Sequence, residues 1–126
     1  MQNDLSATTE TDRLIASDKV EGTAVYNRNG ENLGSIYNLM VDKRSGHVEY
    51  AVLSFGGFLG MGENFYPLPW KELSYDPSLR GYVVDLDKSA LDHAPSYAAD
   101  EAAAWDEPGY GRRVDDYWGG RLAEGI

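Results

Sequence analysis

The stretch that decides the fold is residues 33–55, which read LGSIYNLMVDKRSGHVEYAVLSF. Side chains alternate in character along 33–43 and again along 47–55, and this two-residue period is typical of β-strands. Residues 43–46, which end in a glycine, favour a tight turn between the two strands. Neither strand keeps a polar face towards its end, so we expect other parts of the protein to cover both faces.

Shorter strands are predicted on both sides of this pair. The Asn29-Gly30 pair supplies the positive φ angles that a tight hairpin needs, and residues 77–80 favour a later turn. Pro67 and Pro69 indicate an edge or a bulge, because proline cannot donate to a strand ladder. The expected strands span residues 23–26, 33–43, 47–55, 64–70, 73–76 and 81–86. Five or six short strands at this spacing favour a mainly β fold built as a small closed barrel.

The chain divides into three segments of different character. Residues 1–12 are polar and lack periodicity, so we expect a disordered leader. Residues 13–88 hold the predicted barrel. Residues 89–126 are expected to form a C-terminal, partly helical extension that packs on the barrel or on a second subunit.

Within this extension the pattern changes from strands to helices. Residues 89–94 predict a helical turn. Ser96 can cap a helix over 97–105, which is rich in alanine and carries acidic residues near its start. The Pro108-Gly109 pair is expected to end this helix, and residues 110–120 are expected to be irregular but aromatic.

Composition excludes several classes of function. The 126 residues carry a formal net charge of −10, which disfavours free DNA or RNA and anionic lipid surfaces as partners. The absence of cysteine excludes disulfides, thiolate metal sites and a cysteine nucleophile. No signal peptide and no membrane span is predicted, so we expect a soluble, cytoplasmic protein.

The extension is unusually rich in aromatic side chains. Burying a large apolar side chain contributes roughly 1.5 to 3 kcal/mol, so several rings left in water would be a liability. Either the tail folds back over its own barrel, or it reaches across to a second copy. The candidate contact residues of the tail are Trp105, Tyr110, Tyr117 and Trp118.

A second candidate contact element is the glycine-rich loop 56–63. Phosphate binding does not fit this loop, because no Lys-Ser/Thr pair follows Gly62 and Glu63 would repel a phosphate. Phe58, Leu59 and Met61 project from it as apolar side chains. They fit contact with a partner or a second copy, or packing on the tail.

No arrangement in the sequence predicts catalysis, a cofactor or a metal. His47 and His93 lie on different elements, whereas a metal site needs several converging ligands. The turn at Asp42 does not fit calcium, because Arg44 occupies a ligand position. No serine lies in a Gly-x-Ser-x-Gly nucleophile motif. We therefore expect a protein that is not an enzyme.

Three passages, Tyr26–Ile36, Val41–Val48 and Phe65–Leu73, together resemble the PRC-barrel family. This β domain is shared by the photosynthetic reaction-centre H subunit and the ribosome maturation factor. The likeness covers residues 14–86, and Leu91–Tyr97 with the tail is similar to stand-alone bacterial members. The resemblance implies a small β-barrel that contacts other proteins and has no catalytic site. Neither specific role is carried over, because this chain lacks the H subunit's membrane helix and the maturation factor's additional barrel domain.

Two hypotheses about function follow. In the first, the protein is an interaction or scaffold module that acts as a homodimer, with the long strands or the Phe58–Met61 loop at the interface and an unidentified protein as further partner. In the second, the barrel binds a small ligand in a pocket lined by Tyr37, Tyr50, Tyr66 and Trp70.

Overall fold

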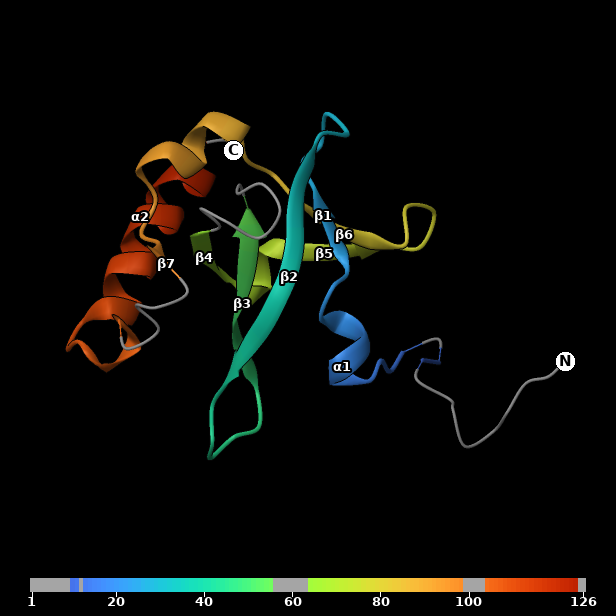
Figure 1. The fold of residues 1–126 in the computed structure, drawn as a ribbon, viewed down its shortest axis with the longest axis horizontal. Coiled ribbons are helices and arrows are strands. Elements are labelled where there is room, and N and C mark those ends of the chain that lie inside the picture. Colours follow the sequence, from blue (N-terminus) through green and yellow to red (C-terminus); the bar gives the residue numbers. More distant parts are fainter. Residues whose placement is uncertain (1–9, 12, 56–63, 99–103, 125–126) are drawn as a thin grey trace, which may run out of the picture.

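The computed structural model describes residues 10–11, 13–55, 64–98 and 104–124 (Figure 1). The helical elements are α1 (Ser17–Val20), η2 (Trp70–Glu72), η3 (Lys88–His93) and α2 (Tyr110–Glu124). The strands are β1 (Ala24–Tyr26), β2 (Asn32–Val41), β3 (Val48–Phe55), β4 (Asn64–Pro69), β5 (Leu73–Asp76), β6 (Gly81–Val84) and β7 (Tyr97–Ala98). All six predicted strands are present within a few residues, and the mainly β class is confirmed. The predicted leader lies mostly outside the described residues.

The seven strands form one sheet in the order β5-β6-β1-β2-β3-β4-β7. Neighbouring strands are antiparallel except for β1 and β6, which are parallel. β5 and β7 are the edges and do not pair with each other, so the sheet is open and the predicted closed barrel is not confirmed. Figure 1 shows that strong twist instead sets β5 and β6 across the direction of β2 and β3.

The sheet has two differently covered faces. Residues directly opposite each other on paired strands share a face, so Tyr50, Val52 and Ser54 of β3 lie with their partners on β4 on one face, here called the helix face. Ala51 and Leu53 lie on the other, here called the core face. Buried side chains of the core face and its surroundings include Val25, Leu33, Ile36, Leu53, Leu68, Tyr82 and Val84.

A close approach of the two long strands depends on Gly34. Its φ is +132°, and an added Cβ would lie 2.1 Å from the backbone oxygen of Ser54. Only glycine fits such a position, because any side chain would overlap the neighbouring strand. The glycine in residues 33–55 therefore sets how closely β2 and β3 can lie.

The predicted helix over 97–105 is wrong at residues 97–98 and 104–105, and residues 99–103 lie outside the described residues. Tyr97 and Ala98 instead pair with Phe65 and Asn64 as β7, and residues 104–106 form a single 3-10 turn. The alanine-rich composition favours a helix locally, but β4 offers an unpaired edge, and the ladder bonds and the burial of Tyr97 outweigh that preference.

The expectation that residues 110–120 are irregular is also wrong, because they lie within α2. The Pro108-Gly109 pair precedes this helix instead of ending an earlier one, with Gly109 at a φ of +83°. The glycines at 111, 119 and 120 lower helix propensity. Apolar side chains at positions 110, 114 and 118 lie one above the other on one side of the helix, and their packing offsets this cost.

Within the described part of the chain, no helix is both long enough and apolar enough to cross a membrane.

Candidate functional site

The most strongly built contact joins α2 to the helix face of the sheet. Tyr110, Val114 and Trp118 follow each other at four-residue spacing and are fully or almost fully buried. The indole Nε1 of Trp118 donates a hydrogen bond of 2.9 Å to the carbonyl of Pro67. Among the described residues β7 pairs with Asn64 and Phe65 at the start of β4, and the indole of Trp118 supplies a donor further along the same edge.

A cluster of aromatic rings seals the end of α2 that lies near β7. The indole Nε1 of Trp105 donates to the hydroxyl of Tyr97 at 3.0 Å. Its ring centroid lies 5.0 Å from that of Tyr110 and 5.2 Å from that of Tyr50, at angles typical of tilted and edge-to-face pairs. Burial raises the pKa of Tyr110 to about 12, so its phenol stays neutral at ordinary pH.

Tyr50 connects the long strands to α2. Its hydroxyl donates to a carboxylate oxygen of Asp115 at 3.0 Å and lies 3.3 Å from the carbonyl oxygen of Gly111. Burial, followed by the hydrogen bond and negative charge of Asp115, raises the pKa of Tyr50 to about 12. This phenol is therefore a fixed donor to the helix and a poor proton-transfer group near neutral pH.

The structure thus places the predicted tail residues on the sheet of their own chain, the first of the two arrangements considered. Tyr117 is half-buried and its hydroxyl donates to the carbonyl of Ala90, while Trp118 is fully buried. Tyr110 and Trp118 consequently offer no free surface to a partner in this arrangement. The loop residues Phe58, Leu59 and Met61 lie outside the described residues.

Apolar side chains remain uncovered beside α2, on the β2–β3 hairpin. The register pairs Met40 with Tyr50, so Met40 lies on the helix face, and nearer the turn it pairs Val41 with Val48. A register shift between Met40 and Val41 leaves Glu49 as an extra residue on β3, as β-bulges do. Tyr37 lies at a second shift, with its ring 4.3 Å from that of Phe65. We call Tyr37, Met40, Val41 and Val48 the hairpin strip.

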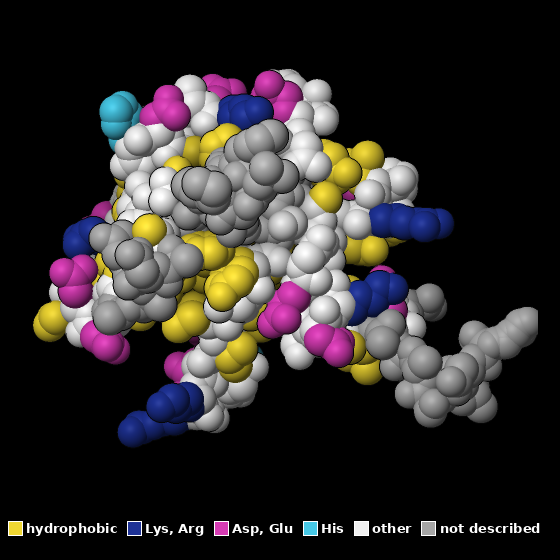
Figure 2. Space-filling model, viewed as in Figure 1, with side chains coloured by type: hydrophobic (Ala, Val, Ile, Leu, Met, Phe, Trp, Pro, Cys, Tyr) yellow, Lys and Arg dark blue, Asp and Glu magenta, His cyan; other side chains and the backbone are white. Residues whose placement is uncertain are grey.

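The hairpin strip ends at a basic turn. Figure 2 shows apolar side chains along this hairpin and basic side chains at its tip, which are Lys43 and Arg44. A carboxylate oxygen of Asp42 accepts the backbone N–H groups of Arg44 and Ser45 at 2.8 and 2.9 Å. These bonds lower the pKa of Asp42 and make its carboxylate a cap of the turn.

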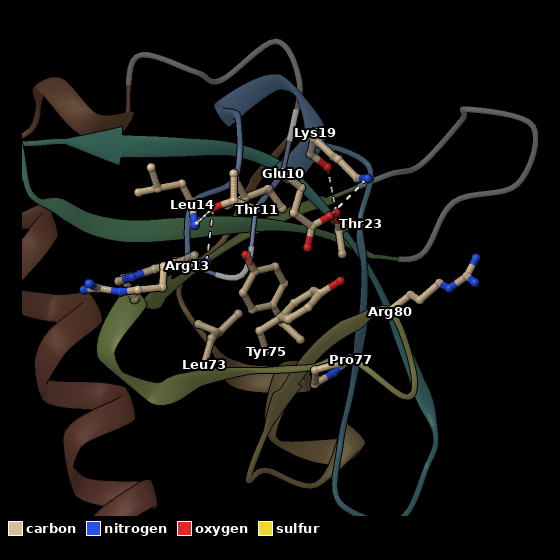
Figure 3. Close-up of a pocket in the computed structure, with 13 residues that line it drawn as sticks. Glu10, Thr11, Arg13, Leu14, Lys19, Thr23, Leu73, Tyr75, Pro77 and Arg80 are labelled. Carbon is tan, nitrogen blue, oxygen red and sulfur yellow. Dashed lines mark hydrogen bonds and ion pairs between the residues drawn. The ribbon is translucent and has the colours of Figure 1, made fainter. Parts of the chain in front are cut away.

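A cleft of about 730 Å³ lies on another part of the molecule, between β5 and described residues 10–11 and 13–23 (Figure 3). It is lined by Glu10, Thr11, Arg13, Leu14, Ile15, Lys19, Thr23, Trp70, Leu73, Tyr75, Pro77, Arg80 and Tyr82. The sequence did not predict this cleft because its two walls are far apart along the chain, and no local pattern indicates that they lie side by side.

The lining of this cleft differs from that of the pocket predicted from the sequence. Of the four side chains expected there, only Trp70 lines the cleft. Tyr37 is exposed on the hairpin strip, Tyr50 is bonded to α2, and Tyr66 is buried on the core face. The rings that do line it with Trp70 are Tyr75 and Tyr82, from β5 and β6.

The described polar residues do not converge on a metal. His47 and His93 are both exposed and lie on separate elements. Among the residues that the structure describes, no group of three or more His, Asp or Glu side chains is placed to hold a metal ion.

These observations define a class of small domain with a strongly twisted, open β-sheet, a helix sealed against one face, and an apolar strip left open beside that helix. The family model of the PRC-barrel domain matches residues 12–91, more than half of the chain. The chain belongs to the PRC-barrel domain family, and the resemblance found in its sequence is confirmed. A search of curated proteins found no match.

Proposed function

We propose that this PRC-barrel protein is a non-catalytic interaction module that acts as a homodimer through the hairpin strip. The observation that carries the proposal is the exposure of two apolar side chains on one strand, β2, 52% for Tyr37 and 51% for Val41. α2 packs on the helix face of the same sheet. Exposed apolar side chains gathered on one hairpin are typical of protein contact sites.

A second copy is the occupant that fits the charges best. The hairpin tip carries Lys43 and Arg44, and neither forms an ion pair with another described residue. The chain as a whole has a net charge of −10, and α2 presents Asp115 and Asp116 as exposed acids. In a two-fold dimer every contact between two different residues occurs twice, so the basic tip of each copy can lie near acidic surface of the other copy.

The polar contacts beside the strip support a non-catalytic role. Tyr50 and Asp115 form a polar pair there, and their hydrogen bond joins strand to helix. The raised pKa of Tyr50 keeps the phenol protonated near neutral pH. This pair therefore fits a structural role, in which it holds β3 against α2 beside the hairpin strip, better than a role in proton transfer.

The test is the mass of the protein in solution, measured by light scattering coupled to gel filtration. We expect a species of about twice the 13.9 kDa chain mass, and we expect Val41→Asp to shift it towards the monomer. Leu79→Asp is the matched control, because it introduces the same charge at an apolar side chain of similar exposure, 43%, on the turn between β5 and β6.

A wild-type protein that stays at the mass of one chain at micromolar concentration would overturn the homodimer. Equal dissociation by Val41→Asp and Leu79→Asp would also overturn it, because the effect would then come from net charge and not from the hairpin strip. Thermal unfolding of each variant shows whether the chain is still folded when its mass is measured.

A further inference from the structure

The cleft beside β5 has a wall of aromatic rings. The ring centroid of Tyr82 lies 5.4 Å from that of Trp70 and 5.1 Å from that of Tyr75. Tyr82 is buried, whereas Tyr75 on the sheet edge is 38% exposed. Figure 3 shows Tyr75 and Leu73 on one side of the cleft. Such a wall offers the flat face that a planar apolar ligand packs against.

The charge of the cleft is opposite to that of the protein. Its lining includes Arg13, Lys19 and Arg80 but only one carboxylate, that of Glu10, which leaves two formal positive charges on a chain of net charge −10. Glu10 and Lys19 pair with each other at 3.0 Å. The two arginines form no ion pair with another described residue.

The arginines lie where they could close on a ligand. Figure 3 shows Arg13 and Arg80 extending outward from opposite ends of the cleft. Both are exposed, so ordinary rotamer changes can bring either guanidinium over the rings. Arg80 also has a φ of +52°, the left-handed region that other residue types, glycine above all, adopt more easily. Strain at a cleft-lining side chain is a feature of ligand sites.

We propose that this cleft binds a small aromatic anion, such as an aromatic carboxylate, sulfonate or phosphate. The ring of the ligand packs against Tyr75 and Tyr82, and its anionic group accepts hydrogen bonds from Arg13 or Arg80. A guanidinium fork suits the oxygens of such groups. The volume of about 730 Å³ is in the range of small-molecule sites. An aromatic cation is disfavoured by the surplus of positive charge.

The probe for the test is the dye anilinonaphthalene sulfonate, an aromatic anion whose fluorescence rises in apolar surroundings. Phenylnaphthylamine is the matched neutral probe, because it has the same rings without the sulfonate. We expect the double variant Arg13→Gln/Arg80→Gln to weaken binding of the anionic dye about tenfold or more, as the loss of a hydrogen-bonded charge pair does. Binding of the neutral probe should be unchanged.

The control is Arg28→Gln/Arg112→Gln, which removes the same charge from exposed arginines that do not line the cleft. It should leave the affinity for both probes unchanged. Equal weakening by the two double variants, or no weakening by Arg13→Gln/Arg80→Gln, would overturn the proposal. So would a wild-type protein that does not enhance the dye's fluorescence.

Two further variants place the dye on the molecule. Tyr75→Ser should weaken binding of both probes, because it removes the exposed ring. Val41→Asp should leave the affinity for both probes unchanged. Weaker dye binding by this variant would overturn the proposal, because it would place the dye on the hairpin strip. If Tyr75→Ser does not fold, the arginine variants still test the proposal, because both arginines are exposed and their substitution removes no buried contact.

Discussion

Replacing Trp118 by alanine tests whether the tail is part of the folded domain. This side chain is fully buried between α2 and the sheet, and its indole N–H donates to the carbonyl of Pro67. Truncating a buried tryptophan to alanine costs about 3–5 kcal/mol, because apolar contacts are lost and a cavity remains. We expect Trp118→Ala to lower the free energy of unfolding by about 4 kcal/mol, a large fraction of the about 5–15 kcal/mol typical of a domain.

A second substitution separates packing from hydrogen bonding. Trp118→Phe keeps much of the ring but removes the N–H, which leaves the carbonyl of Pro67 without its donor. An unsatisfied buried acceptor costs about 1–3 kcal/mol, so we expect a loss in that range, smaller than that of the alanine variant. Arg112→Ala, at an exposed position of the same helix, should change the stability by no more than about 0.5 kcal/mol.

The assay is urea-induced unfolding followed by far-UV circular dichroism, which does not depend on tryptophan fluorescence. All variants are compared at one protein concentration, because stability depends on concentration if the chain dimerises. A loss below about 1 kcal/mol for Trp118→Ala would refute the reasoning, since a cavity of this size cannot be created in a packed interior so cheaply. It would mean that α2 does not seal the helix face.

Two further predictions concern the long strands. Gly34→Ala should lower the free energy of unfolding by more than about 3 kcal/mol or prevent folding, because its Cβ would lie 2.1 Å from the backbone oxygen of Ser54. Gly30→Ala is the control, since its Cβ would meet open space; with a φ of +83° it should cost about 1 kcal/mol. Equal losses of stability in urea unfolding would contradict this prediction. Burial and Asp115 raise the pKa of Tyr50 from its ordinary value of about 10 to about 12. The folded state therefore holds this proton more tightly, and the resulting stability is complete below about pH 10 and is lost as the pH rises towards about 12. Tyr50→Phe should reduce the fall in stability over that interval, and an unchanged alkaline slope would speak against the shift.

The β part of the fold could be predicted because its signals are local. The alternating pattern of residues 33–55 and the turns at Asn29-Gly30 and Gly46 each depend on neighbours within a few positions. The family likeness rested on the same turns and on the proline–tryptophan passage at Pro67–Trp70. The aromatic residues of the tail were also expected to need cover, because their number alone implies buried surface.

The C-terminal errors arose where local preference and tertiary contact disagree. The alanine-rich residues after Ser96 favour a helix on propensity, but Tyr97 pairs with the free edge of β4. The glycine-rich residues after Gly109 disfavour a helix, but Tyr110 and Trp118 gain burial on the sheet only if this segment is helical.

Sequence patterning was therefore sufficient for β1 to β6, their turns and the family, since these depend on the period of side chains along one segment. The open edges of the sheet, the choice of the chain's own tail as cover, the exposed hairpin strip and the cleft were decided only by tertiary structure. Each depends on contacts such as Trp118 with Pro67, 51 residues apart, or Tyr50 with Asp115, 65 apart. The free energy of such a contact depends on two segments that are distant along the chain, so the pattern of neither segment alone predicts it.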